Sequence, residues 1–137
     1  MTRAILDPNI LVSAFISQRG CSPDLIVRAW REGAFELVVS TQLIAELTGV
    51  LGRPKFAVQA ADGRAEAYIA GLAGDAIHIE DPPDAPAVSP DASDDYLIAL
   101  ARAARADVIV SGDRHLTQLV DPNPPVLTPR EFTEQLT

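Results

Sequence analysis

Acidic side chains stand at or just after the end of two apolar segments that the sequence predicts to be strands. Asp7 ends the first of these segments, and Asp113 comes three residues after the segment 107–110. The carboxyl ends of parallel strands share one edge of a sheet, where the ligands of α/β proteins bind. Asp94 and Asp95 stand in the first turn of a predicted helix, which in an α/β unit begins at that same edge. We therefore expect these carboxylates to lie close together.

A further acid, Glu46, lies on a predicted amphipathic helix at the edge of its apolar stripe. The residues three and four positions away are Gln42, Leu43, Gly49 and Val50, so no lysine or arginine of this helix can pair with it. A place at the edge of the stripe points the carboxylate along the body of the protein and not out into water.

Unpaired carboxylates at one edge of a sheet repel one another, and burial increases that repulsion. A hard divalent cation relieves it, and a site made only of oxygen ligands favours Mg²⁺ or Mn²⁺. Two such ions, about 3.5–4 Å apart, can activate a water molecule and stabilise both oxygens of an in-line phosphodiester displacement. The carboxylates therefore indicate metal-dependent hydrolysis of phosphodiesters.

Each acid also has a purely structural explanation. Asp7 can cap the helix that follows it, and Asp113 can cap a turn. Asp94 and Asp95 can each offset a helix dipole. No other catalytic motif competes with the acids, because the sequence contains no Gly-x-Ser-x-Gly, no glycine-rich phosphate loop ending in Lys-Ser or Lys-Thr, and no His-Glu-x-x-His.

The elements that would position these acids alternate between strand and helix. Strands are predicted at 3–7, 35–39, 76–79, 107–110 and 125–127. Helices are predicted at 8–16, 22–32 with Ser22 as its cap, 41–51 opened by Ser40, 57–72, a helix capped by Asp91 or Ser93 that runs to about 105, 115–119, and from 129 onward. The proline-rich segment 80–90 is predicted to be a loop. This alternation predicts an α/β fold, a three-layer α/β/α sandwich around a central, mainly parallel sheet of four to five strands.

Length and composition indicate one domain, residues 1–137. Nineteen acidic and eleven basic residues give a net charge of −8, which argues against a non-specific nucleic-acid binder unless several acids bind cations. A single cysteine, Cys21, fits a reducing cytosol and excludes a zinc cluster built on thiolates. No apolar run approaches the roughly 18 residues of a membrane helix, and the carboxylate of Asp7 argues against a signal peptide. We therefore expect a cytoplasmic protein.

Five short motifs follow one another along the chain. They are ILDPNILVS at 5–13, IAEL at 44–47 before RPKF at 53–56, DDYLIALA at 94–101, VIVSGD at 108–113 with Leu116, and LTPREF at 127–132. None of them is specific alone, but the ordered set covers nearly the whole chain. It resembles the PIN-domain nucleases of the VapC-like type, the toxin components of prokaryotic toxin–antitoxin systems.

The resemblance implies a metal-dependent endoribonuclease with a PIN-like fold, in which acids hold Mg²⁺ or Mn²⁺. By position, the acidic quartet of the family is matched by Asp7, Glu46, Asp95 and Asp113. The spacing of the third motif favours Asp95 as the third acid, and Asp94 could serve as a fifth carboxylate.

Two polar residues match supporting positions of the family. Asn9 stands two residues after the first aspartate, and Ser111 stands where the family often has threonine or serine, a position that orients the site by hydrogen bonding. The implied partners are an RNA substrate, a cognate antitoxin protein and, in a homodimer, a second copy of the chain; no membrane is implied.

Three basic residues are candidates for holding the RNA backbone. Arg53 and Lys55 follow the helix that carries Glu46, and Arg114 adjoins Asp113. Ordinary solvated loop charges explain these residues almost equally well.

The alternative function is a PIN-fold module that binds RNA or a protein without cutting, and the intact acidic set argues against it. Phosphotransfer proteins fit less well. A phosphatase of the haloacid-dehalogenase type needs aspartate where Asn9 stands, and a receiver domain needs a late lysine, whereas the single lysine is Lys55.

Overall fold

Seven α-helices, one 3₁₀ turn and five strands make up the computed structural model, which describes residues 1–17, 19–83 and 95–136. The strands are β1 (Arg3–Leu6), β2 (Glu36–Val39), β3 (Ile77–His78), β4 (Val108–Val110) and β5 (Val126–Leu127). The helices are α1 (Pro8–Ile16), α2 (Ser22–Arg31), α3 (Thr41–Leu51), α4 (Arg64–Asp75), α5 (Asp95–Ala103), α6 (Arg114–Thr117) and α7 (Pro129–Leu136), and the 3₁₀ turn η1 covers Pro54–Phe56.

The five strands form one parallel sheet in the order β3-β2-β1-β4-β5. β1 is therefore the central strand, and its last residue, Leu6, lies opposite Val110 at the end of β4. Ala4, Ile5 and Leu6 are all fully buried, as expected for a parallel strand that is covered on both faces.

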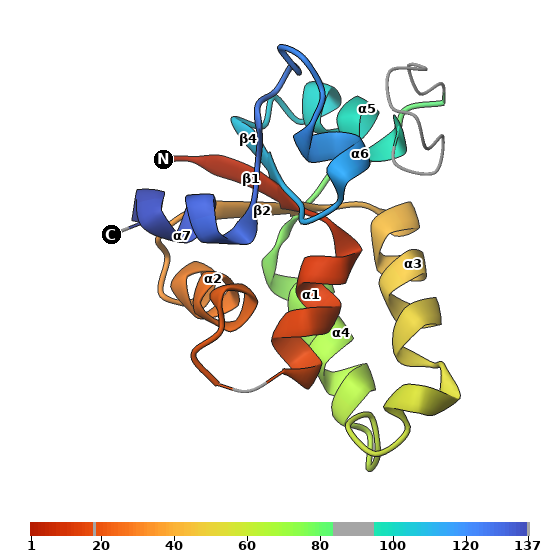
Figure 1. Ribbon diagram of the computed structural model, residues 1–137. Helices are drawn as coiled ribbons and strands as arrows, with labels where there is room; N and C mark the ends of the chain where they lie inside the picture. Colours follow the sequence, from red (N-terminus) through yellow and green to blue (C-terminus); the bar gives the residue numbers. More distant parts are fainter. Residues whose placement is uncertain (18, 84–94, 137) are drawn as a thin grey trace.

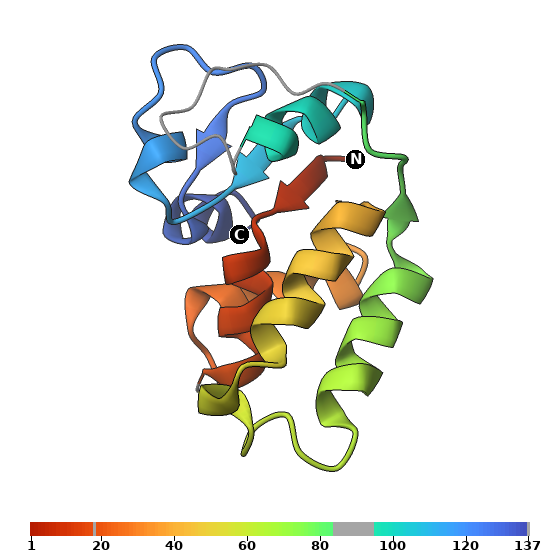
Figure 2. The same cartoon turned by 90° about the vertical axis from the view of Figure 1, so that its right-hand side faces the viewer.

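Helices cover both faces of this sheet (Figure 1). Figure 2 shows α1 to α4 gathered on one side of the sheet and α5 on the other. α5 packs on β1 and β4, and α7 packs on β5 and α2. The predicted α/β/α sandwich with a parallel sheet is therefore confirmed.

Local sequence signals explain where two helices begin. Pro8 occupies the first turn of α1, where its missing N–H costs nothing. The hydroxyl of Ser40 accepts a hydrogen bond from the backbone N–H of Leu43 at 3.2 Å and so caps α3, as predicted.

Two sequence predictions about helix starts are wrong. Ser22 is not the cap of α2 but its first residue, and Cys21 takes the N-cap position. The predicted helix 57–72 does not begin before Arg64, because Asp62 and Gly63 adopt left-handed backbone angles, with φ of 60° and 75°, that a right-handed helix cannot contain.

The predicted caps Asp91 and Ser93 lie outside the described residues, as does most of the loop 80–90. Within the described part of the chain, no helix is both long and apolar enough to span a membrane.

Candidate functional site

Asp7 lies where the central strand β1 passes into α1, and it is only 5% exposed. Its backbone N–H donates to the carbonyl of Val110 at 2.9 Å, which continues the pairing with β4 past the end of the strand. Its Oδ1 accepts a hydrogen bond from the backbone N–H of Asn9 at 3.0 Å and so caps α1. The capping explanation is thus confirmed, and it leaves the second carboxylate oxygen for another partner.

That partner is Ser111, the residue after β4, which is fully buried. Its hydroxyl donates to Oδ2 of Asp7 at 2.8 Å. The same Oγ accepts the backbone N–H of Asp113 at 3.0 Å. One buried hydroxyl therefore links the acids that follow two neighbouring strands.

Asp113 caps the short helix α6. Its Oδ1 accepts the backbone N–H of His115 at 2.8 Å, and Nδ1 of the same histidine lies 3.6 Å from that oxygen. The side chain of Asp113 is 29% exposed, far more than that of Asp7. The capping explanation holds here as well, with a carboxylate that still reaches solvent.

The two carboxylates interact electrostatically. Burial raises the pKa of Asp7 above its ordinary value, and the negative charge of Asp113 raises it further. The hydrogen bonds from Asn9 and Ser111 oppose this rise but do not cancel it. The edge of the sheet therefore holds an acid whose charge the protein itself disfavours.

Glu46 does not lie as the sequence predicted. The buried face of α3 consists of Leu43, Leu47 and Leu51, and one step along a helix turns a side chain by about 100°, so Glu46 is exposed. Its carboxylate nevertheless has a partner on another helix, because Oε2 accepts a hydrogen bond from the hydroxyl of Tyr96 at 2.8 Å.

Sequence reasoning missed Tyr96. The signal was its place beside Asp95 in an otherwise apolar helix, because a buried tyrosine hydroxyl needs a hydrogen-bond partner. Asp95 is the first residue of α5 and is 4% exposed, so the predicted third acid is buried at the start of the helix. Asp94 lies outside the described residues.

The hydroxyl of Tyr96 lies in the field of several carboxylates. Burial raises its pKa most, followed by the hydrogen bond to Glu46 and the charges of Glu46, Asp7 and Asp81. These acids come from α3, from the end of β1 and from the segment after β3. The acids of three separate segments thus act on one point at the edge of the sheet.

Asp81 was also missed by sequence reasoning. It follows the end of β3 by three residues, the same spacing that singled out Asp113 after β4, but it was assigned to a loop. Its Oδ2 accepts the backbone N–H of Gln42 at the start of α3 at 2.9 Å. Its Oδ1 is buried and has no hydrogen-bond partner in the described part of the chain.

The chemistry of this edge suits a hard cation, because the carboxylates there and the hydroxyls of Ser111 and Tyr96 all offer oxygen. Among the described residues, however, no group of three or more His, Cys, Asp or Glu side chains is arranged to hold a metal ion. The structure brings together Asp7 with Asp113 through Ser111, and Glu46 with Tyr96 beside Asp95. A shared ion would have to draw these carboxylates closer than they lie here.

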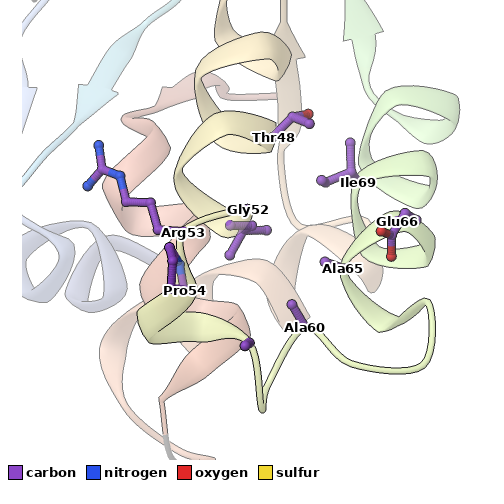
Figure 3. A pocket seen from close by; sticks show the side chains of 10 residues that line it. Thr48, Gly52, Arg53, Pro54, Ala60, Ala65, Glu66 and Ile69 are labelled. Carbon is purple, nitrogen blue, oxygen red and sulfur yellow. The ribbon is translucent and has the colours of Figure 1, made fainter.

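The three basic candidates do not form one group. Arg53 and Lys55 are exposed at the end of α3 and in η1, which Figures 1 and 2 both place far from α6, where Arg114 is exposed beside Asp113. Arg53 lines a pocket of about 260 Å³ between α3, η1 and α4, with Glu66 on the α4 side (Figure 3). None of the predicted acids lines this pocket.

Comparisons with known proteins agree with this architecture. A family model described as "PIN domain" matches residues 3–115, the range that contains all the predicted acids. No curated protein sequence matches the chain.

Several solved structures share the fold at low sequence identity. VapBC2 from Rickettsia felis, bound to a DNA fragment from its promoter, has a TM-score of 0.60 and 16% identity over 93% of this chain and 98% of that chain. PAE2754 from Pyrobaculum aerophilum has a TM-score of 0.58 and 16% identity over 98% and 89%. The PIN domain of human SMG5 has a TM-score of 0.53 and 12% identity over 98% and 99%.

Proposed function

The chain belongs to the PIN domain family, and from that premise we propose that it is a Mg²⁺- or Mn²⁺-dependent endoribonuclease that hydrolyses RNA phosphodiester bonds. PIN domains are generally nucleases. The observation that carries the proposal is the buried Ser111 hydroxyl, which ties Asp7 to the backbone of Asp113 at the carboxyl ends of adjacent strands. Residues 1–137 would act as a single domain, in the cytoplasm.

In this proposal three acids share one task and the fourth supports them. Asp7, Asp95 and Asp113 hold the cation, and Glu46 either contacts it or acts through a water molecule. A bound Mg²⁺ or Mn²⁺ would supply the positive charge that activates water and stabilises the displaced oxygen. Ser111 fixes the orientation of Asp7, whose other oxygen is already fixed by the N–H of Asn9.

The elevated pKa of Asp7 supports a cationic ligand at this edge. Burial and the charge of Asp113 both disfavour the ionised form of Asp7, and a cation between the two carboxylates would reverse the sign of their interaction. Arg114, exposed beside Asp113, would contact the RNA backbone near the cut, and Arg53 with Lys55 would contact it farther away.

The proposed function includes a role as the toxin of a toxin–antitoxin pair. The fold shared with VapBC2 of Rickettsia felis supports a toxin that works with a cognate antitoxin, and we expect a homodimer in solution. The alternative, a PIN-fold module that binds RNA or protein without cutting, is favoured by one observation: no three acids of the described residues are in position for a metal ion.

Cleavage of a labelled single-stranded RNA by the purified protein separates the two. We expect cut products with Mn²⁺ or Mg²⁺, none with EDTA, and none from the Asp7→Asn variant with Mn²⁺. RNA that is bound but uncut at millimolar Mn²⁺ would assign the chain to the non-catalytic alternative.

A further inference from the structure

We propose that Tyr96 is a positioning residue that holds the Glu46 carboxylate ready for the cation at the edge of the sheet. This inference rests on the proposed function. It concerns a hydrogen bond between residues 50 positions apart in the sequence, with the Tyr96 hydroxyl as donor and Oε2 of Glu46 as acceptor at 2.8 Å.

The bond connects the two helical layers. α3, which carries Glu46, packs on α1 and α4, whereas α5, which carries Tyr96, packs on β1 and β4. Figure 2 shows these helices on opposite sides of the sheet. The bond therefore crosses the edge where β1 and β4 end. It sets the position of Glu46, on α3, relative to Asp95, which adjoins Tyr96 on α5.

The side chains of Tyr96 and Glu46 differ in conformational freedom. Tyr96 is 9% exposed, on a helix whose first seven residues, Asp95 to Ala101, are all buried. Glu46 is exposed, and an exposed glutamate loses side-chain entropy when it is fixed in one rotamer. The buried ring is thus the fixed partner, and the hydrogen bond offsets part of this entropy before the cation binds.

Several carboxylates act on the Tyr96 hydroxyl, but its hydrogen bond goes to one of them. The carboxylates of Asp7 and Asp81 also act on the Tyr96 hydroxyl, yet its single proton is directed at Glu46. The hydrogen bond engages Oε2 of Glu46 and leaves Oε1 for a ligand. Glu46 is therefore restrained with one oxygen still directed to other partners.

A simpler explanation is that a buried tyrosine hydroxyl needs any acceptor. Tyr68 offers a matched control, because its hydroxyl donates to the backbone carbonyl of Leu11 at 2.7 Å, with no carboxylate as partner. Phenylalanine keeps both rings and removes only the hydroxyl. Loss of the Tyr96 hydroxyl leaves Glu46 solvated, so the fold should tolerate the change.

The test is Mn²⁺ affinity, measured by isothermal titration calorimetry on wild type, Tyr96→Phe, Tyr68→Phe, Glu46→Ala and the double variant Tyr96→Phe/Glu46→Ala. We expect Tyr96→Phe to weaken Mn²⁺ binding by about 10–100-fold, the range for residues that orient metal ligands. Tyr68→Phe should bind Mn²⁺ like wild type. The double variant should bind no more weakly than Glu46→Ala, because Tyr96 acts through that carboxylate.

Several results would overturn the proposal. Wild-type affinity in Tyr96→Phe, an equal loss in Tyr68→Phe, or a further loss in the double variant each removes the positioning role while leaving the proposed function intact. A wild-type protein that neither binds Mn²⁺ nor cleaves RNA overturns the proposed function, and the inference with it.

Discussion

The hydroxyl of Ser111 lies 2.8 Å from Oδ2 of Asp7, although 104 positions separate the two residues in the sequence. The same oxygen accepts the backbone N–H of Asp113, so Ser111 belongs at once to the core and to the group of acids. Its removal should therefore affect both stability and the response to metal.

Ser111→Ala should lower the free energy of unfolding by about 1–3 kcal/mol, because it leaves a buried carboxylate oxygen and a backbone N–H without their partner. Urea denaturation measures this loss. We also expect a smaller Mn²⁺-induced rise in melting temperature than in wild type, because Asp7 is no longer held in place.

Ser40→Ala is the matched control. Ser40 is equally buried and follows β2 as Ser111 follows β4, but its hydroxyl caps α3 and, among the described residues, has no hydrogen bond to an acid. Its loss should cost about 1 kcal/mol and leave the Mn²⁺ response unchanged. Equal Mn²⁺ responses in the two alanine variants would contradict a special role for Ser111.

Metal should stabilise the folded protein. A ligand at about 100 times its dissociation constant adds about 2.7 kcal/mol to the free energy of unfolding. Asp7→Asn keeps the size of the side chain but removes its charge, so it should abolish most of this stabilisation. Differential scanning calorimetry with Mn²⁺ and with EDTA checks the prediction, and identical melting of the wild type under both conditions would refute it.

In EDTA, the stability of the wild type relative to Asp7→Asn should fall as the pH rises. The pKa of Asp7 in the folded protein is raised above its ordinary value of 3.8. Its contribution to stability is therefore fully present below that value and is lost as the pH rises through the raised pKa. Urea denaturation of both proteins from about pH 4 to about pH 7 measures the difference, and a pH-independent difference would mean that the pKa is not raised.

The third acid should be Asp95 and not Asp94. Asp95 is buried at the start of α5, at the edge of the sheet, so Asp95→Asn should lose RNA cleavage while Asp94→Asn keeps most of it. Because catalytic groups that work together are not additive, each of Asp7→Asn, Asp95→Asn and Asp113→Asn should cost nearly as much activity as all three together. The reverse ranking of the two neighbours would move the role to Asp94.

Charge reversal at Arg114 and Arg53 tests the RNA contacts. Arg114→Glu should weaken RNA binding and reduce the slope of log affinity against log salt by about one unit for each phosphate that the protein no longer neutralises. Arg53→Glu should have a smaller effect, because Arg53 lies with η1, at the far end of α3 from the sheet. Binding titrations at several salt concentrations give both slopes, and wild-type slopes would identify the two arginines as ordinary surface charges.

The sequence predicted the sheet and the acids at its edge because both follow from local patterns. In an α/β protein, a short and largely apolar segment such as 3–6 is typical of a strand that is buried on both faces. Asp7 and Asp113 were found because parallel strands end at one edge, whatever the distance along the chain. Pro8 and Ser40 located the start of two helices because a first-turn proline and a capping serine are also local signals.

The contacts between layers could not be predicted in this way. A helical pattern gives the rotation of Glu46 about the axis of α3, but not how far that axis lies from α5, so the bond to Tyr96 was missed. The same pattern predicted that Glu46 points along the body of the protein and not into water, whereas the residue is exposed. Asp81 was missed because its role depends on the N-terminus of α3, 39 residues away, which no pattern around residue 81 reveals.

The central place of β1 has a consequence for the synthesis of the protein. The ribosome releases Asp7 about a hundred residues before Ser111 and Asp113, and pairings between such distant segments form late in folding. At about 5–20 residues per second, several seconds pass between the two events. If the chain acts as proposed, it would be inert until β4 has emerged, and the ribosomal RNA around the nascent polypeptide would not meet the assembled acids while the segment between β1 and β4 is being made.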